Sequence, residues 1–137
     1  MLDRLLATSA VTALVSTRIY ALKLPQDPVT PAVRVQLIDE PSEYHLRGDV
    51  GLTRARVQTD CYVKENVSGG NPYGRANTLA DAVHVALSGQ TFQNAGSPAE
   101  IEVSGCFRAS RIVMYESAEF NAVRVMQDYI VWSRSLN

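Results

Sequence analysis

The sequence predicts an α+β fold, in which an antiparallel sheet of about four main strands carries two helices on one face. Three observations lead to this class. Two stretches place apolar residues at helical spacing, several segments alternate apolar and polar residues, and the elements follow the order α-β-β-α-β-β. The chain has 137 residues, 46% hydrophobic and 20% charged, so we expect a single domain over 1–137 that buries its own core.

The first predicted helix covers about 2–16, where apolar residues recur at helical spacing between polar ones. Prolines then crowd the chain up to residue 31 and exclude a helix or a central strand, so this stretch is predicted to be an extended surface connector. A strand follows at 32–39, where apolar and polar residues alternate. Residues 41–52 are mostly polar with two glycines, and are predicted to form a long loop or a protruding hairpin tip.

The clearest alternation covers 54–64 and predicts a strand that pairs antiparallel with the strand at 32–39. The second helix is predicted over about 72–88. Asn71 suits its N-cap, Pro72 its first position and Gly89 the position just past its end.

The last third of the chain is strand-like. Alternation from Ile101 to Arg108 predicts a strand with a break near Ala109. Residues 112–115 and 122–132 are rich in Val, Ile, Tyr and Trp, which predicts a hairpin or a bulged pair. The segment 122–132 is apolar on both faces, so one of them needs a second cover, such as another subunit.

Composition excludes several classes of protein. Thirteen basic and fourteen acidic side chains leave a formal net charge of -1, which argues against binding nucleic acid through bulk positive charge. No run approaches the roughly 20 apolar residues of a membrane helix, and the order of a signal peptide is missing. We expect a soluble protein made in a cytosol, without a membrane partner, in which Cys61 and Cys106 are reduced and partly buried.

No motif identifies a catalytic or metal site, so neither enzyme activity nor a cofactor is expected. The two histidines, His45 and His84, lack the partners of a Ser-His-Asp constellation, and the two cysteines lack the spacing of metal ligands. One alternative stays open at the end of the first strand. A small enzyme or ligand-binding domain using Asp39, Glu40, Glu43 and His45 would be favoured by a deep pocket there.

Partner contact is the function that the residues allow more readily. Arg54 and Arg56 project together, because strand side chains repeat every two residues, and form either a basic stripe for an acidic partner or a solvated face. Aromatic and basic residues in the predicted hairpin tip and the second apolar face of 122–132 add to them. The candidate interface residues are Tyr44, His45, Arg47, Arg54, Arg56, Ile130 and Trp132.

The opening of the chain resembles that of tail completion proteins of long-tailed bacteriophages. The similarity lies in residues 5–20, LLATSAVTALVSTRIY, followed by Leu24-Pro25-Gln26 and Pro31-Ala32-Val33. It continues in residues 54–62, RARVQTDCY, in the helical run LADAV from Leu79, and in DYIVW from Asp128. The resemblance therefore covers most of the chain.

This resemblance implies a tail-to-head joining or tail terminator protein without enzymatic role. Such a subunit forms a ring, commonly a hexamer, on the head-proximal end of the tail tube. Its partners are then other copies of itself, the tail tube protein and the head connector or stopper protein, and DNA passes through the channel without specific binding. It is expected in the neck of the virion, after assembly in the host cytoplasm. Another neck protein, a connector stopper or a tail tube subunit, remains an alternative.

Overall fold

The computed structural model describes residues 1–49, 51–65, 71–93, 100–116 and 121–136. Its helices are α1 (Leu2–Leu6), α2 (Ser9–Val15) and α3 (Pro72–Leu87). Its strands are β1 (Ile19–Ala21), β2 (Ala32–Asp39), β3 (Tyr44–His45), β4 (Gly48–Asp49), β5 (Leu52–Lys64), β6 (Phe92–Gln93), β7 (Ile101–Glu116) and β8 (Ala122–Ser135).

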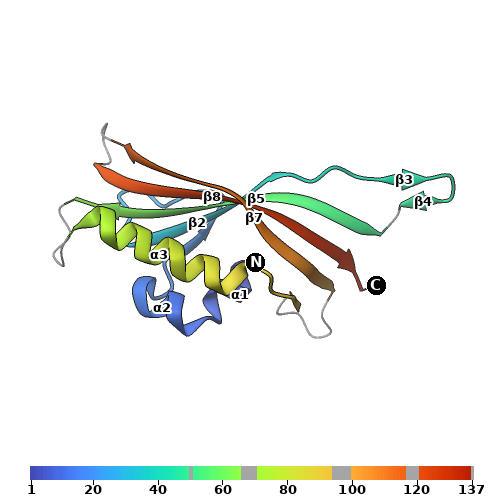
Figure 1. Ribbon diagram of the computed structural model, residues 1–137, viewed down its shortest axis with the longest axis horizontal. Helices are drawn as coiled ribbons and strands as arrows, with labels where there is room; N and C mark the ends of the chain where they lie inside the picture. Colours follow the sequence, from blue (N-terminus) through green and yellow to red (C-terminus); the bar gives the residue numbers. More distant parts are fainter. Residues whose placement is uncertain (50, 66–70, 94–99, 117–120, 137) are drawn as a thin grey trace.

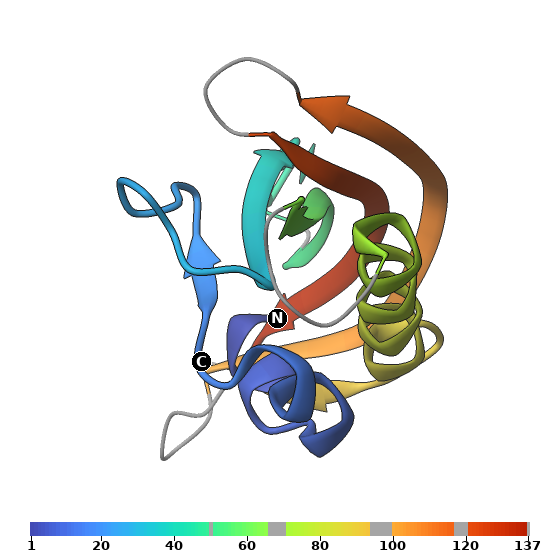
Figure 2. The ribbon, with the colours of Figure 1, turned by 90° about the vertical axis from the view of Figure 1, so that its left-hand side faces the viewer.

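Six of the strands form one curled sheet in the order β1-β2-β5-β8-β7-β6 (Figure 2). The four long strands in the middle are antiparallel, as the sequence predicts. The strand count of about four is wrong, because β1 and β6 extend the sheet at its edges. β1, at the start of the predicted connector, pairs parallel with β2. These edge strands have three and two residues, which is too short for an alternation pattern to be read.

The predicted helix over 2–16 is two helices, α1 and α2, with a break at Ala7 and Thr8. Thr8 has an extended backbone, and its hydroxyl donates to the carbonyl of Arg4 over 2.7 Å. Threonine competes in this way for backbone partners, which explains why helical spacing of the apolar residues was not sufficient for a continuous helix. The described residues therefore form three helices where the sequence predicted two.

The second predicted helix is confirmed as α3. The Asn71 side chain accepts a hydrogen bond from the Tyr73 backbone N–H over 3.0 Å, Pro72 stands at the first position, and Gly89 after the end has a φ of 68°. Its buried face consists of Ala76, Leu79, Ala80, Val83, Ala86 and Leu87.

The predicted break near Ala109 is instead a bulge inside one long strand. β7 pairs with β8 from Ile101 to Glu116, and its register shifts between Arg108 and Ser110 and again near its start. A bulge inserts an unpaired residue without ending the strand, so the alternation changes phase while the sheet continues.

All three helices pack near one end of the molecule on the same face of the sheet, while β5, β7 and β8 continue beyond them (Figure 1). The core lies between this face and the helices. Cys61 and Cys106 are free and buried there, and burial raises the pKa of the Cys106 thiol to about 11. Strand alternation leaves the other face of β2, β5, β8 and β7, here called the open face, directed away from the helices.

Candidate partner interface

Four of the seven candidate interface residues meet on the open face. Arg54 is paired with Trp132, and Arg56 with Ile130, in the register of β5 and β8. The guanidinium carbon of Arg54 lies 6.0 Å from the centre of the Trp132 ring, a cation–π geometry. The period of two therefore predicted correctly that Arg54 and Arg56 share a face.

Arg56 is bound within the chain. Its Nη2 lies 2.8 Å from Oδ2 of Asp128, which also accepts a hydrogen bond from the Ser110 hydroxyl. The Asp128 side chain is only 7% exposed, whereas that of Arg56 is 52% exposed. This hydrogen bond raises the pKa of the Arg56 guanidinium. Arg56 therefore neutralises the charge of a buried carboxylate. The interpretation of Arg56 as part of a merely solvated face is incomplete.

Beside these residues, a row of charges crosses the four long strands. Asp60 on β5 is fully buried and lies 2.6 Å from Nη2 of Arg34 on β2 and 3.0 Å from Nε of Arg124 on β8. Arg124 also pairs with Glu116 on β7 at 2.7 Å. We call this row, Arg34, Asp60, Arg124 and Glu116, the charge ladder. Sequence reasoning missed it, because the register that aligns residues so distant in the chain is not visible in a single sequence.

The open face of strand 122–132 is less apolar than the sequence predicted, because the charge ladder crosses it. On the open face of β8, the charged Arg124 and Asp128 alternate with Met126 and Ile130, which are half-buried by neighbouring side chains. The chain itself thus covers much of this face. Another subunit as the second cover of this strand stays a prediction, because Met126, Ile130 and Trp132 keep part of their surface exposed.

The remaining three candidates lie on a separate hairpin. β3 and β4 pair only with each other and project from one end of the molecule, which confirms the hairpin alternative for this segment (Figure 1). We call residues 43–49 the arm. Tyr44 is 72% exposed, and Nδ1 of His45 accepts a hydrogen bond from the backbone N–H of Arg47 over 3.0 Å. Leu46, at the tip, is fully exposed although it is apolar.

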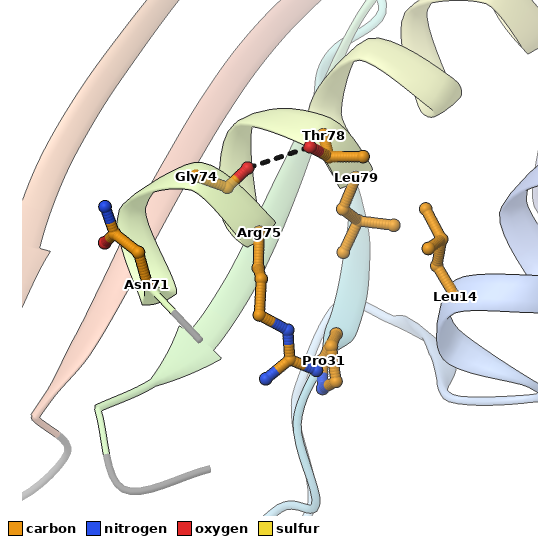
Figure 3. Close-up of a pocket in the computed structure, with 7 residues that line it drawn as sticks. All are labelled: Leu14, Pro31, Asn71, Gly74, Arg75, Thr78 and Leu79. Atoms are coloured by element: carbon orange, nitrogen blue, oxygen red, sulfur yellow. Dashed lines mark hydrogen bonds between the residues drawn. The ribbon is translucent and has the colours of Figure 1, made fainter. Parts of the chain in front are cut away.

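One pocket lies between α2, α3 and the start of β2 (Figure 3). It has a volume of about 360 Å³ and is lined by Leu14, Pro31, Asn71, Gly74, Arg75, Thr78 and Leu79. The Thr78 hydroxyl donates to the carbonyl of Gly74, and the Arg75 side chain extends toward Pro31. These seven side chains include no carboxylate or histidine to serve as a general base, and none of the candidate interface residues lines the pocket.

A second pocket, of about 330 Å³, touches the neighbourhood of the enzyme alternative. It is lined by Glu40, Thr53, Glu100, Ile101, Ser133, Arg134 and Ser135. Of the four residues in that alternative it contains only Glu40, while His45 lies on the arm. Within the described residues, no three His, Cys, Asp or Glu side chains are grouped to hold a metal ion. None of the helices formed by the described residues has the length and apolarity to cross a membrane.

Comparison with known proteins gives a family match and a likeness to solved structures. A family model described as "Tail completion protein gp17" matches residues 1–132. A chain in a solved structure titled "Virion of native gene transfer agent (GTA) particle" has 19% sequence identity and a TM-score of 0.62, covering 97% of this chain and 89% of that chain. At this identity the likeness shows a shared fold. No curated protein matches the chain.

Proposed function

Because the chain belongs to the tail completion protein gp17 family of bacteriophage structural virion proteins, we propose that it forms a ring at the head-proximal end of the tail tube. The ring ends the tail and joins it to the head connector. The observation that carries this proposal is the family match, which spans residues 1–132 of 137. The role is structural, without catalysis, in the neck of the virion after assembly in the host cytoplasm.

The proposed partners are other copies of the chain, most simply six, the tail tube protein and the head connector or stopper protein. The arm supports a role in docking, because Tyr44 and Leu46 offer large apolar surface outside the body of the molecule. Arg54 and Trp132 on the open face offer a second contact of the kind enriched at protein interfaces.

DNA passes through the ring without specific binding in this proposal. Two features support that part. The formal net charge is -1, and three arginines of the open face, Arg34, Arg56 and Arg124, are already paired with carboxylates of the same chain. A guanidinium held by an internal carboxylate is not free to neutralise a phosphate.

The experiment is to image particles of a phage that lacks this protein. We expect filled heads and unattached tails of irregular, increased length, and complete particles again when the wild-type protein is supplied. Tails of normal length beside heads that lose their DNA indicate a connector stopper instead. Absence of any tail tube indicates a tube subunit. Complete, infectious particles from the deletion contradict all three roles.

A further inference from the structure

The outer edge of β7 is open over most of its length. β6 pairs with β7 only at Glu102 and Val103, and no other strand in the described residues lies beyond β7. The backbone N–H of Gly89 donates to the carbonyl of Cys106 over 2.8 Å, so the open part begins at Phe107. We call residues 107–116 the β7 edge. Unpaired N–H and C=O groups along such an edge are a template for another strand.

Large apolar side chains are exposed on both faces of the β7 edge. Ile112 and Met114 share the open face with their β8 partners, and Val113 and Tyr115 lie on the other face. The exposed fractions are 53% for Phe107, 45% for Ile112, 39% for Val113, 36% for Met114 and 48% for Tyr115. Proteins that stay monomeric protect such edges with charges, prolines or short strands. This edge combines an open backbone with apolar cover on each side, as a strand inside a sheet does.

The opposite edge of the sheet is open as well. β1 pairs with β2 only from Val33 to Val35, which leaves β2 uncovered from Gln36 to Asp39. We call residues 36–39 the β2 edge. Leu37 and Ile38 there are 53% and 40% exposed, again on both faces of the strand.

Strand direction makes these two edges compatible. β2, β5, β8 and β7 alternate in direction, so β2 and β7 run opposite ways in one subunit. When a second copy lies alongside in the same orientation, its β2 runs antiparallel to β7 of the first. The antiparallel pattern of the sheet then continues from one copy into the next.

The positions of the two edges along the sheet agree with this pairing, and so do the basic side chains of the β7 edge. Arg108 pairs with Tyr129, Tyr129 with Val57 and Val57 with Leu37, so Arg108 and Leu37 lie at the same height on opposite edges. Subunits in a closed ring keep the same height, which places the β7 edge at Arg108 of one copy beside the β2 edge at Leu37 of the next. Pairing of two β7 edges by a two-fold axis would instead bring basic residues together.

We propose that the β7 edge of one copy pairs antiparallel with the β2 edge of the next copy, and that this head-to-tail contact joins the subunits. Contacts between two different patches generate closed rings or open filaments rather than dimers. The inference deepens the proposed function, on which it rests for closure of the contact into a ring.

The test blocks each edge separately with a lysine. Val113→Lys blocks the β7 edge, Leu37→Lys blocks the β2 edge, and Val85→Lys on α3, where Val85 is 73% exposed, is the matched control. In sedimentation velocity at up to about 1 mM protein, wild type and Val85→Lys should form higher oligomers, whereas each edge variant alone should stay monomeric. Circular dichroism and thermal melting verify folding, and Ile112→Lys replaces Val113→Lys if the latter does not fold.

Mixing the two edge variants distinguishes the kind of contact. One intact β7 edge and one intact β2 edge remain in the mixture, so an equimolar mixture should form a heterodimer and nothing larger. Dimers of Leu37→Lys alone would show β7-to-β7 pairing and overturn the proposal. So would a wild type that stays monomeric at about 1 mM, or edge variants that associate like wild type.

Failure of this inference and failure of the proposed function are separable. Oligomers that are insensitive to both edge lysines leave a tail ring possible through another surface. Edge-dependent oligomers, in a phage whose deletion still gives complete particles, would leave the contact intact and remove the role in the tail.

Discussion

The carboxylate of Asp60 has the clearest energetic consequence of any single residue on the open face. It has no exposed surface and accepts hydrogen bonds from Arg34, Arg124 and Gln58. Asp60→Asn removes the charge that both guanidiniums neutralise, and leaving them partly buried without it is costly. We expect the free energy of unfolding to fall by about 3–5 kcal/mol, measured by urea denaturation.

The matched control is Asp27→Asn. Asp27 also pairs with a cation, Lys64 at 3.1 Å, but its side chain is 93% exposed. Exposed pairs contribute little, so this variant should unfold at nearly the urea concentration of wild type. Equal destabilisation by the two substitutions would contradict a structural role for the charge ladder.

Arg54 and Arg56 should separate in stability although they share a face. Arg56→Ala leaves the buried carboxylate of Asp128 without its cation, whereas Arg54→Ala loses only a contact with the Trp132 ring. We therefore expect a lower melting temperature for Arg56→Ala and nearly unchanged melting for Arg54→Ala, measured by differential scanning calorimetry. Arg54→Ala is then the cleaner variant for an assay of joining between phage heads and phage tails. Identical melting of both variants would contradict the role of Asp128.

At the scale of elements, α3 contains a pH-sensitive group. His84 lies near the end of this helix, with Nδ1 3.3 Å from the Tyr129 hydroxyl. Burial, assisted by Arg108 and Arg111, lowers the pKa of His84 below its ordinary value of 6.5. The unfolded chain therefore binds this proton more readily than the folded chain does.

The lowered pKa of His84 fixes the direction in which stability changes with pH. The contribution of His84 is fully present above pH 6.5 and is lost as the pH falls below that value toward the lower pKa of the folded state. His84→Gln should lose less stability than wild type between pH 7.5 and pH 5, a difference measured by urea denaturation at each pH. Parallel stability curves for the two proteins would contradict this assignment.

Local patterns predicted most elements, and tertiary contacts decided the others. Caps at Asn71 and Gly89 and the alternation in β2 and β5 are local signals, so these elements were correct. The break at Thr8 depends on one side chain that competes with the backbone. β1 and β6 exist because neighbouring strands offer hydrogen bonds, and few local residues indicate them.

The candidate interface divides in the same way. The parity of strand residues correctly grouped Arg54 with Arg56 and Ile130 with Trp132, because a period of two is local information. The ladder formed by Arg34, Asp60 and Arg124 depends on register between distant strands. The open β7 edge depends on strand order, and single-sequence alternation does not state which strand is outermost.

At the scale of the whole molecule, the arm should be the part that changes most on assembly. Its strands have two residues each and form a sheet of their own, and its apolar side chains are exposed. We expect rapid hydrogen exchange at residues 43–49 in the free subunit and protection in assembled tails. The polar composition of residues 43–52 and their two glycines predict this mobility for the whole segment, of which position 50 lies outside the described residues. Protection in the free subunit equal to that of the 54–63 amides would contradict the prediction.

The position of β8 in the sheet also determines how long a subunit is open to incorrect strand pairing during synthesis. Leu52 pairs with Arg134 and Lys64 with Ala122, so α3 and β7 are both synthesised between the two halves of the central strand pair. Pairings across such separations form slowly, because the entropy of closing the chain is lost before any contact compensates for it. In a nascent chain, the edge of β5 that pairs with β8 therefore has no partner strand until β8 leaves the ribosome. The rate at which β8 docks sets how long each new subunit can mispair with its neighbours on a polysome.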